Sequence, residues 1–130
     1  MARILIAEDE AALRSLVARA LVAEGHAVKV APDGAQALEV LGREPFDLLL
    51  ADIKMPIMDG IALALAAARD YPALVVTLMT GYADQRERAY GLEALIHDVL
   101  TKPFTLAELR QAVGAALAAA RPPGGLLKAF

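Results

Sequence analysis

The 130-residue sequence contains no cysteine and no tryptophan, and aromatic residues make up only 5% of it. Without cysteine the chain can form neither disulfides nor thiolate metal sites, which fits a reducing compartment. No apolar run approaches the roughly 20 residues that a membrane-spanning helix needs. The apolar start "MARILIA" is too short for a signal-peptide core and is followed at once by acidic residues. We therefore expect a cytoplasmic protein that has no membrane-embedded part.

An excess of positive charge is missing as well. The chain carries 13 basic and 16 acidic residues, for a net charge of -3, and the basic residues are scattered. Nucleic-acid binding proteins usually present a basic patch or stripe, so the sequence gives no reason to expect a nucleic-acid partner. It also lacks a glycine-rich phosphate loop, because the turn after the first apolar run reads "AEDEAA". This argues against a domain that binds a nucleotide or flavin.

What the sequence does contain is a regular alternation of strand-like and helix-like segments. Strands are expected at 3–7, 26–31, 46–52, 73–80 and within 94–103. Helical patterns follow them, namely before Gly25, at 35–41, at 61–70, at 81–90 and after Thr105. Five units of strand then helix favour an α/β fold with a five-stranded parallel sheet and helices on both faces.

Polar residues stand where four of these strands end. Glu8 and Asp9 follow the first strand, Asp52 ends the third, Thr80 ends the fourth and Lys102 ends the fifth. In a parallel α/β sheet, ligands bind beyond the carboxyl ends of the strands. We therefore expect these five side chains to converge at one edge of the sheet.

Such a set of side chains has a particular chemistry. Neighbouring carboxylates raise each other's pKa, and a divalent cation relieves their repulsion. Ligands that are all oxygen favour Mg²⁺ over zinc. Together with the positive charge of Lys102 and the hydroxyl of Thr80, the acids provide what stabilises a phosphoryl group in transit. Asp52 is then a candidate nucleophile that forms an acyl phosphate.

Four stretches, "ILIAEDE", "DLLLADIKMPIMDG", "LMTGYAD" and "VLTKPF", resemble the receiver domains of bacterial two-component response regulators. The resemblance covers nearly the whole chain. It implies a flavodoxin-like fold with strand order 2-1-3-4-5. The receiver domain is expected at residues 1–119 and a flexible C-terminal tail at 120–130.

The resemblance also implies roles for individual residues around the acceptor. Asp52 corresponds to the phosphoacceptor, while Asp9 binds Mg²⁺ directly and Glu8 largely through water. The main-chain carbonyl of Lys54 is expected to be a further metal ligand. The side chains of Lys54 and Tyr82 occupy the positions that tune hydrolysis of the acyl phosphate in such proteins.

Other implied roles concern the phosphoryl group and the switch. Thr80 is expected to hydrogen-bond a phosphoryl oxygen and Lys102 to pair with the phosphate, with a cis bond before Pro103 that turns the lysine inward. The sequence departs from the family at Val99, where receivers usually have Phe or Tyr. An aliphatic side chain cannot make the inward swing that this aromatic residue makes.

The implied partners are a histidine kinase or a histidine phosphotransfer protein as phosphodonor, and a downstream target protein. Too few residues follow position 119 for an output domain, so a stand-alone receiver that signals by phosphorylation-dependent protein binding is expected. The short chain resembles regulators of the CpdR kind, which assist proteolysis by the ClpXP protease.

Several alternatives stay open. The chain could be a chemotaxis-type regulator or a phosphate shuttle in a relay. An aspartyl-phosphate phosphohydrolase is the alternative among enzymes. Those enzymes usually carry a second aspartate two residues after the nucleophile, and here that position holds Lys54. We therefore expect no enzyme activity beyond the protein's own phosphorylation and dephosphorylation.

Overall fold

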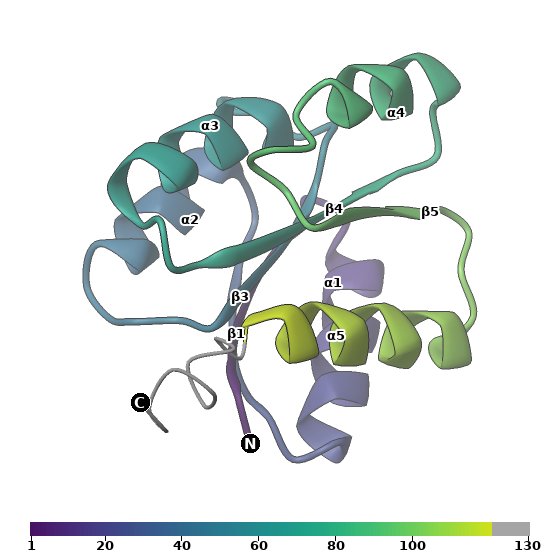
Figure 1. Ribbon diagram of the computed structural model, residues 1–130. Helices are drawn as coiled ribbons and strands as arrows, with labels where there is room; N and C mark the ends of the chain where they lie inside the picture. The colour runs from purple at the N-terminus through teal and green to yellow at the C-terminus, as the bar shows by residue number, and fades with distance from the viewer. Residues whose placement is uncertain (121–130) are drawn as a thin grey trace, which may run out of the picture.

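The structure, a computed structural model, describes residues 1–120, and the predicted tail lies outside the described residues except for Ala120. One parallel sheet has the strand order β2-β1-β3-β4-β5, and a helix follows each strand in the chain (Figure 1). The strands are β1 (Arg3–Ala7), β2 (Ala27–Ala31), β3 (Leu48–Asp52), β4 (Val75–Thr80) and β5 (Asp98–Thr101). The helices are α1 (Ala11–Ala23), α2 (Gly34–Leu41), α3 (Gly60–Asp70), α4 (Ala83–Tyr90) and α5 (Leu106–Ala120). The predicted fold class is confirmed.

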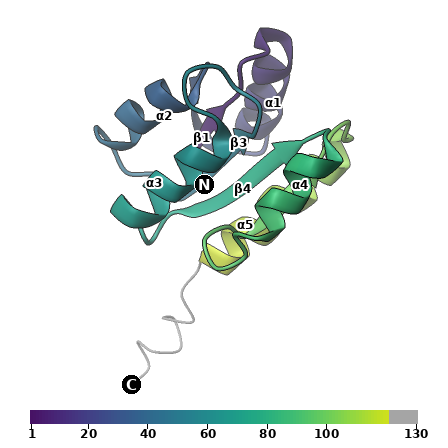
Figure 2. The ribbon, with the colours of Figure 1, turned by 90° about the horizontal axis from the view of Figure 1, so that it is seen from above.

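The helices form one layer on each face of the sheet. Figure 1 shows α1 and α5 on one face and α2, α3 and α4 on the other, and Figure 2 shows α2 and α3 side by side. Each face has its own hydrophobic cluster, and all five residues of β3 are buried between the two layers. Within residues 1–120, no helix is both long enough and apolar enough to cross a bilayer.

Helices α3 and α5 each begin at a residue whose side chain caps the helix. The Asp59 carboxylate accepts a hydrogen bond from the Ala62 N–H at 2.8 Å at the start of α3. At the start of α5, the Thr105 hydroxyl accepts from the Glu108 N–H at 3.0 Å, and the Glu108 carboxylate accepts from the Thr105 N–H at 2.9 Å. This reciprocal pair is a capping box, which satisfies two N–H groups that the helix leaves free.

The strand register brings the carboxyl ends of the central strands together. The last residue of β1, Ala7, lies opposite Ala51 of β3. The residues that follow, Glu8 and Asp52, therefore lie next to each other at the same edge of the sheet. The ends of β4 and β5 are paired in register in the same way. The polar residues after four strands thus share one edge, as the sequence predicts.

The loop from β3 to α3 turns back tightly over the end of its own strand. A Cβ at Gly60 would lie 2.2 Å from the main-chain oxygen of Asp52, a distance that no side chain tolerates. In the same loop the Met58 N–H donates to the Pro56 carbonyl at 2.7 Å, and Ile57 between them has a φ of 70°. That conformation is rare and strained for a β-branched residue. The loop therefore holds Asp52 in a closely packed main-chain environment.

Candidate functional site

Three carboxylates converge at this edge of the sheet. Glu8, Asp9 and Asp52 each offer one oxygen, and these oxygens all lie within 4.8 Å of one another. Glu8 and Asp52 are buried, whereas Asp9 is exposed. The carboxylates open into a cavity of about 740 Å³. It is lined by Glu8, Asp9, Glu10, Asp52, Lys54, Gly81, Tyr82 and Lys102.

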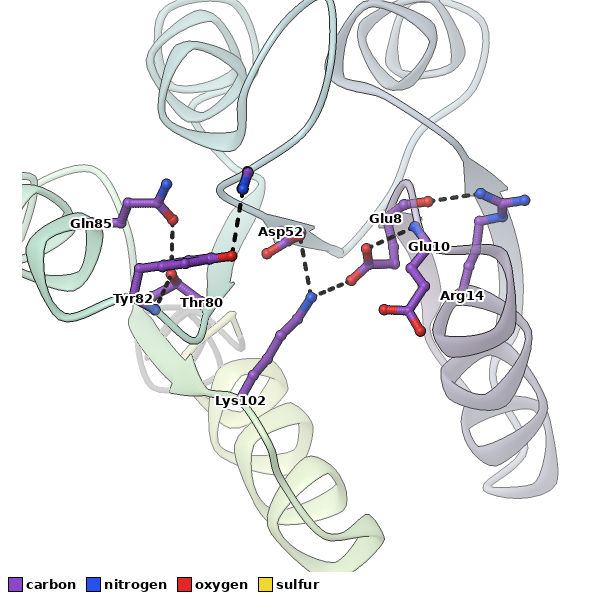
Figure 3. Close-up of polar contacts among 9 residues, drawn as sticks. Glu8, Glu10, Arg14, Asp52, Thr80, Tyr82, Gln85 and Lys102 are labelled. Atoms are coloured by element: carbon purple, nitrogen blue, oxygen red, sulfur yellow. Dashed lines mark hydrogen bonds and ion pairs between the residues drawn. The ribbon is translucent and has the colours of Figure 1, made fainter.

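Lys102 connects the acids across the sheet. Its Nζ lies 2.7 Å from Glu8 Oε1 and 3.2 Å from Asp52 Oδ2, and Figure 3 shows it reaching between the two carboxylates. The Lys102–Pro103 peptide bond is cis, which confirms the expectation for this turn. One ammonium group thus joins the ends of β1, β3 and β5.

Burial and charge shift the ionisation of these groups. Burial raises the pKa of Asp52; Lys102 counteracts this shift, and the charge of Asp9 adds to it. Burial also raises the pKa of Glu8, with Lys102 and the Glu10 N–H acting against it. Burial disfavours the charged form of Lys102, but the hydrogen bond to Glu8 and the charge of Asp52 outweigh this and raise its pKa. The single ammonium group of Lys102 therefore offsets the negative charge of several acids, and further positive charge would stabilise their ionised forms.

Thr80 lies at the same edge, but its hydroxyl is directed toward α4. The side chain is buried, and Thr80 is not among the described residues that line the cavity. The Thr80 hydroxyl donates to Gln85 Oε1 at 3.0 Å and accepts from the Tyr82 N–H at 3.1 Å (Figure 3). The structure therefore brings the three acids and the lysine together, while the threonine hydroxyl is bonded to the start of the neighbouring helix.

Lys54 and Tyr82 form one wall of the cavity. The Lys54 ammonium lies 3.5 Å from the Tyr82 hydroxyl and 5.0 Å from the centre of its ring. A cation over an aromatic face is attracted by the ring quadrupole, whose face has a negative electrostatic potential. The two residues that the resemblance assigns to the control of hydrolysis are therefore in contact with each other.

Two residues of this region were not indicated by the sequence. Gln85 binds the Thr80 hydroxyl, and Arg14 Nη1 donates to the main-chain oxygen of Glu8 at 2.8 Å. Arg14 carries a weak signal in the sequence, since it is a basic residue that closely follows the acidic turn. Gln85 carried none, because only the position of α4 relative to β4 brings it to Thr80.

Val99 fills the position at which the family usually has an aromatic residue. It is buried and belongs to the same hydrophobic cluster as Ala89 of α4. The side chain therefore contributes to the packing between β5 and α4.

The family model described as "Response regulator receiver domain" matches residues 4–114. The chain belongs to the response regulator receiver family. The receiver is 42% identical over 109 residues to the response regulator receiver protein CpdR of Brucella abortus (strain 2308), which covers 84% of this chain and 91% of that protein. It is 35% identical over 120 residues to the response regulator MprA of Mycobacterium leprae (strain TN), which covers 92% of this chain but only 53% of MprA.

Solved structures agree with this assignment. The crystal structure of a CheY-like receiver domain protein from Methanospirillum hungatei JF-1 matches with a TM-score of 0.86 and 29% identity, over 92% of this chain and 96% of that one. Receivers are signalling proteins of two-component systems, in which a histidine kinase or phosphotransfer protein phosphorylates them and they act on downstream targets. The acidic cluster of this receiver has the oxygen ligands that suit Mg²⁺.

Proposed function

We propose that Asp52 is the residue of this receiver that accepts the phosphoryl group. The observation that supports this most directly is its position: a buried carboxylate at the end of β3, facing the cavity and paired with Lys102 at 3.2 Å. A carboxylate oxygen of Asp52 attacks the phosphorus of a phosphohistidine. An O–P bond forms, the N–P bond breaks, and the imidazole of the donor leaves.

The residues of the site also fit a magnesium ion. Three carboxylate oxygens lie within 4.8 Å of one another, and two of the acids are buried with one lysine between them. This set is rich in oxygen and in unbalanced negative charge, which suits a hard divalent cation. Glu8, Asp9, Asp52 and the main-chain carbonyl of Lys54 would hold the ion. When bound, it offsets the negative charge that a phosphoryl group brings into the site.

Other side chains act on the phosphoryl group once it is on Asp52. Lys102 exchanges its contact with Glu8 for one with a phosphoryl oxygen, and the Thr80 hydroxyl donates to another. Lys54 and Tyr82, which already contact each other on the cavity wall, limit the approach of water. Hydrolysis of the acyl phosphate returns the receiver to its initial state.

The output of this chemistry is a change in protein binding. Phosphorylation biases two conformations of the receiver, and the partner surface lies near α4, β5 and α5, which adjoin Thr80 and Lys102. We propose a stand-alone receiver at residues 1–119 with a tail at 120–130, acting in the cytoplasm. The match to CpdR along 91% of its length supports a regulator of that kind, whose partner is the ClpXP protease or its substrates.

The acceptor assignment is tested by incubation with acetyl phosphate and Mg²⁺ and measurement of the intact mass. Wild type should gain one phosphoryl group, and the Asp52→Asn variant should gain none. Asp70→Asn is the matched control, because Asp70 is an exposed aspartate at the far end of α3. Unchanged uptake by Asp52→Asn would reject the assignment. Many turnovers of a phosphate monoester would instead support a phosphohydrolase.

A further inference from the structure

The Thr80 hydroxyl has a single proton, and in this structure that proton is already in use. A threonine hydroxyl donates one hydrogen bond and accepts up to two. Here it donates to Gln85 Oε1 at 3.0 Å and accepts from the Tyr82 N–H at 3.1 Å. Thr80 is 1% exposed, so water does not compete for the hydroxyl. A phosphoryl oxygen on Asp52 could receive this proton only after Gln85 has given it up.

Gln85 and a phosphoryl group on Asp52 would accept the proton of the Thr80 hydroxyl from different directions. Gln85 lies in the first turn of α4, and Figure 3 shows its amide oxygen pointing at Thr80 from that helix, on the side away from Asp52. Gln85 itself is half-buried, so its amide can exchange the threonine for water at little cost. Thr80 cannot make that exchange, because its side chain is buried.

We propose that Gln85 is a positioning residue that holds the Thr80 hydroxyl proton away from the acceptor site in the unphosphorylated receiver. The inference rests on the proposed function, in which Thr80 contacts the phosphoryl group. Each phosphorylation event must then break the bond between Thr80 and Gln85. Breaking it releases a contact between β4 and α4, which transmits the event to that helix. Gln85 thereby weakens the binding of a phosphoryl group and couples it to α4.

A purely structural role for Gln85 makes a different prediction. If the bond served only to stabilise the start of α4, its loss would lower the stability of the protein. The affinity for a phosphoryl group would then stay unchanged or fall. The two roles are therefore separated by the direction in which affinity changes.

The test uses the full chain and beryllofluoride with Mg²⁺ as the phosphoryl probe. Gln85→Met removes the acceptor oxygen while keeping side-chain length and helix propensity. The loss of one hydrogen bond from the free state should tighten beryllofluoride binding about threefold to tenfold, measured by calorimetry. Gln85→Glu keeps an acceptor oxygen and should give no tightening. Ala83→Met, an exposed substitution on the same helix, controls for changes to the surface of α4.

A double-mutant cycle then assigns the effect to Thr80. In a Thr80→Val background the hydroxyl is absent, so Gln85→Met should leave the affinity for beryllofluoride unchanged. A second readout needs neither metal nor probe: the methyl resonance of Thr80 in the free protein should move in Gln85→Met and stay near its wild-type position in Gln85→Glu.

The outcomes distinguish the inference from the function on which it rests. If Thr80→Val binds beryllofluoride as tightly as wild type, the proposed role of Thr80 fails, and the role of Gln85 fails with it. If Thr80→Val weakens binding but Gln85→Met does not tighten it, the role of Gln85 alone is rejected. Equal tightening with and without the Thr80 hydroxyl rejects it as well.

Discussion

Lys102 balances two buried carboxylates with one positive charge. Its ammonium contacts Glu8 at 2.7 Å and Asp52 at 3.2 Å, while Asp9 adds a third negative charge nearby. Charges removed from water are stabilised only when they are paired and hydrogen-bonded. The raised pKa of Asp52 indicates that the pairing does not fully offset its burial. The geometry that suits phosphoryl transfer is therefore unfavourable for the stability of the metal-free protein.

We expect Asp52→Asn to raise the free energy of unfolding at neutral pH, in the absence of metal, by on the order of 1 kcal/mol. A carboxyl group whose pKa is higher in the folded than in the unfolded state stabilises the folded protein when it is protonated. This contribution is fully present below the unfolded-state pKa and is lost as the pH rises through the folded-state pKa. Wild type therefore loses this contribution between acidic and neutral pH, whereas the amide does not titrate. The difference between the two proteins should shrink as the pH is lowered toward about 4.

Urea denaturation at several pH values measures this difference. Asp70→Asn serves as a control, since its carboxylate is exposed and removing its charge leaves no buried group unpaired. A lower stability of Asp52→Asn at neutral pH would contradict the prediction. It would mean that the ion pair with Lys102 stabilises the fold more than burial of the carboxylate destabilises it.

The residues of the site differ in how well the sequence predicts them. The convergence of Glu8, Asp52 and Lys102 follows from their positions after strands of a parallel sheet, and the structure confirms it. The direction of the Thr80 hydroxyl does not follow from the sequence. It depends on Gln85, whose approach is decided by how α4 packs on β4.

At the scale of elements, the helices and strands follow the predicted pattern closely, and the exceptions have local causes. The sequence predicts a fourth helix from residue 81, whereas α4 begins at Ala83. Tyr82 is extended, because its N–H is bonded to the Thr80 hydroxyl rather than directed along a helix axis. Within α1, Val17, Ala20 and Leu21 are buried, whereas the apolar Leu16 is 43% exposed.

Substitution of Gly60 tests how closely the loop from β3 to α3 is packed, and substitution of Gly114 in α5 provides a comparison. Gly60→Ala would place a methyl group 2.2 Å from the main-chain oxygen of Asp52, and overpacking of this kind costs about 1–3 kcal/mol. Gly114 lies within α5, and a Cβ there would meet nothing within 4 Å in the described part of the chain. Gly114→Ala should therefore stabilise the protein by about 0.5–1 kcal/mol.

Thermal or chemical denaturation of both variants is sufficient for this comparison. Both substitutions add one methyl group to a glycine. Opposite signs of the two changes in the free energy of unfolding would therefore reflect the different surroundings of the two residues. Phosphorylation of Gly60→Ala should also slow, because the shifted main chain moves Asp52. A Gly60→Ala protein as stable as wild type would show that the loop accommodates the methyl group by moving.

At the scale of the whole molecule, the sheet separates two hydrophobic clusters and leaves its carboxyl edge to the polar residues. The parallel α/β architecture is predictable, because strand and helix patterns alternate five times. The strand order comes from the family resemblance rather than from the pattern alone, and the structure confirms it. What no local pattern predicts is how the side chains at that edge share their hydrogen bonds.

Because the acids come from different strands of the sheet, metal binding should raise the free energy of unfolding of the whole protein. Mg²⁺ at about ten times its dissociation constant adds about 1.4 kcal/mol to the free energy of unfolding, since only the folded state assembles the acids. Because the ligands must be ionised, this gain should be larger at neutral than at acidic pH. Thermal denaturation with Mg²⁺ or with a chelator measures the gain. It should be strongly reduced in Asp9→Asn, and an equal gain in that variant would argue against a site at the acidic cluster.

The bond between Lys102 and Glu8 joins residues 94 positions apart in the chain. A nascent or refolding polypeptide cannot form it until its first and last strands have entered the same sheet, and such distant pairings are late and slow to form. Reactivity toward acetyl phosphate should consequently appear at the end of folding. For this receiver, the ability to be phosphorylated would therefore report that β1 and β5 have both been incorporated into the sheet.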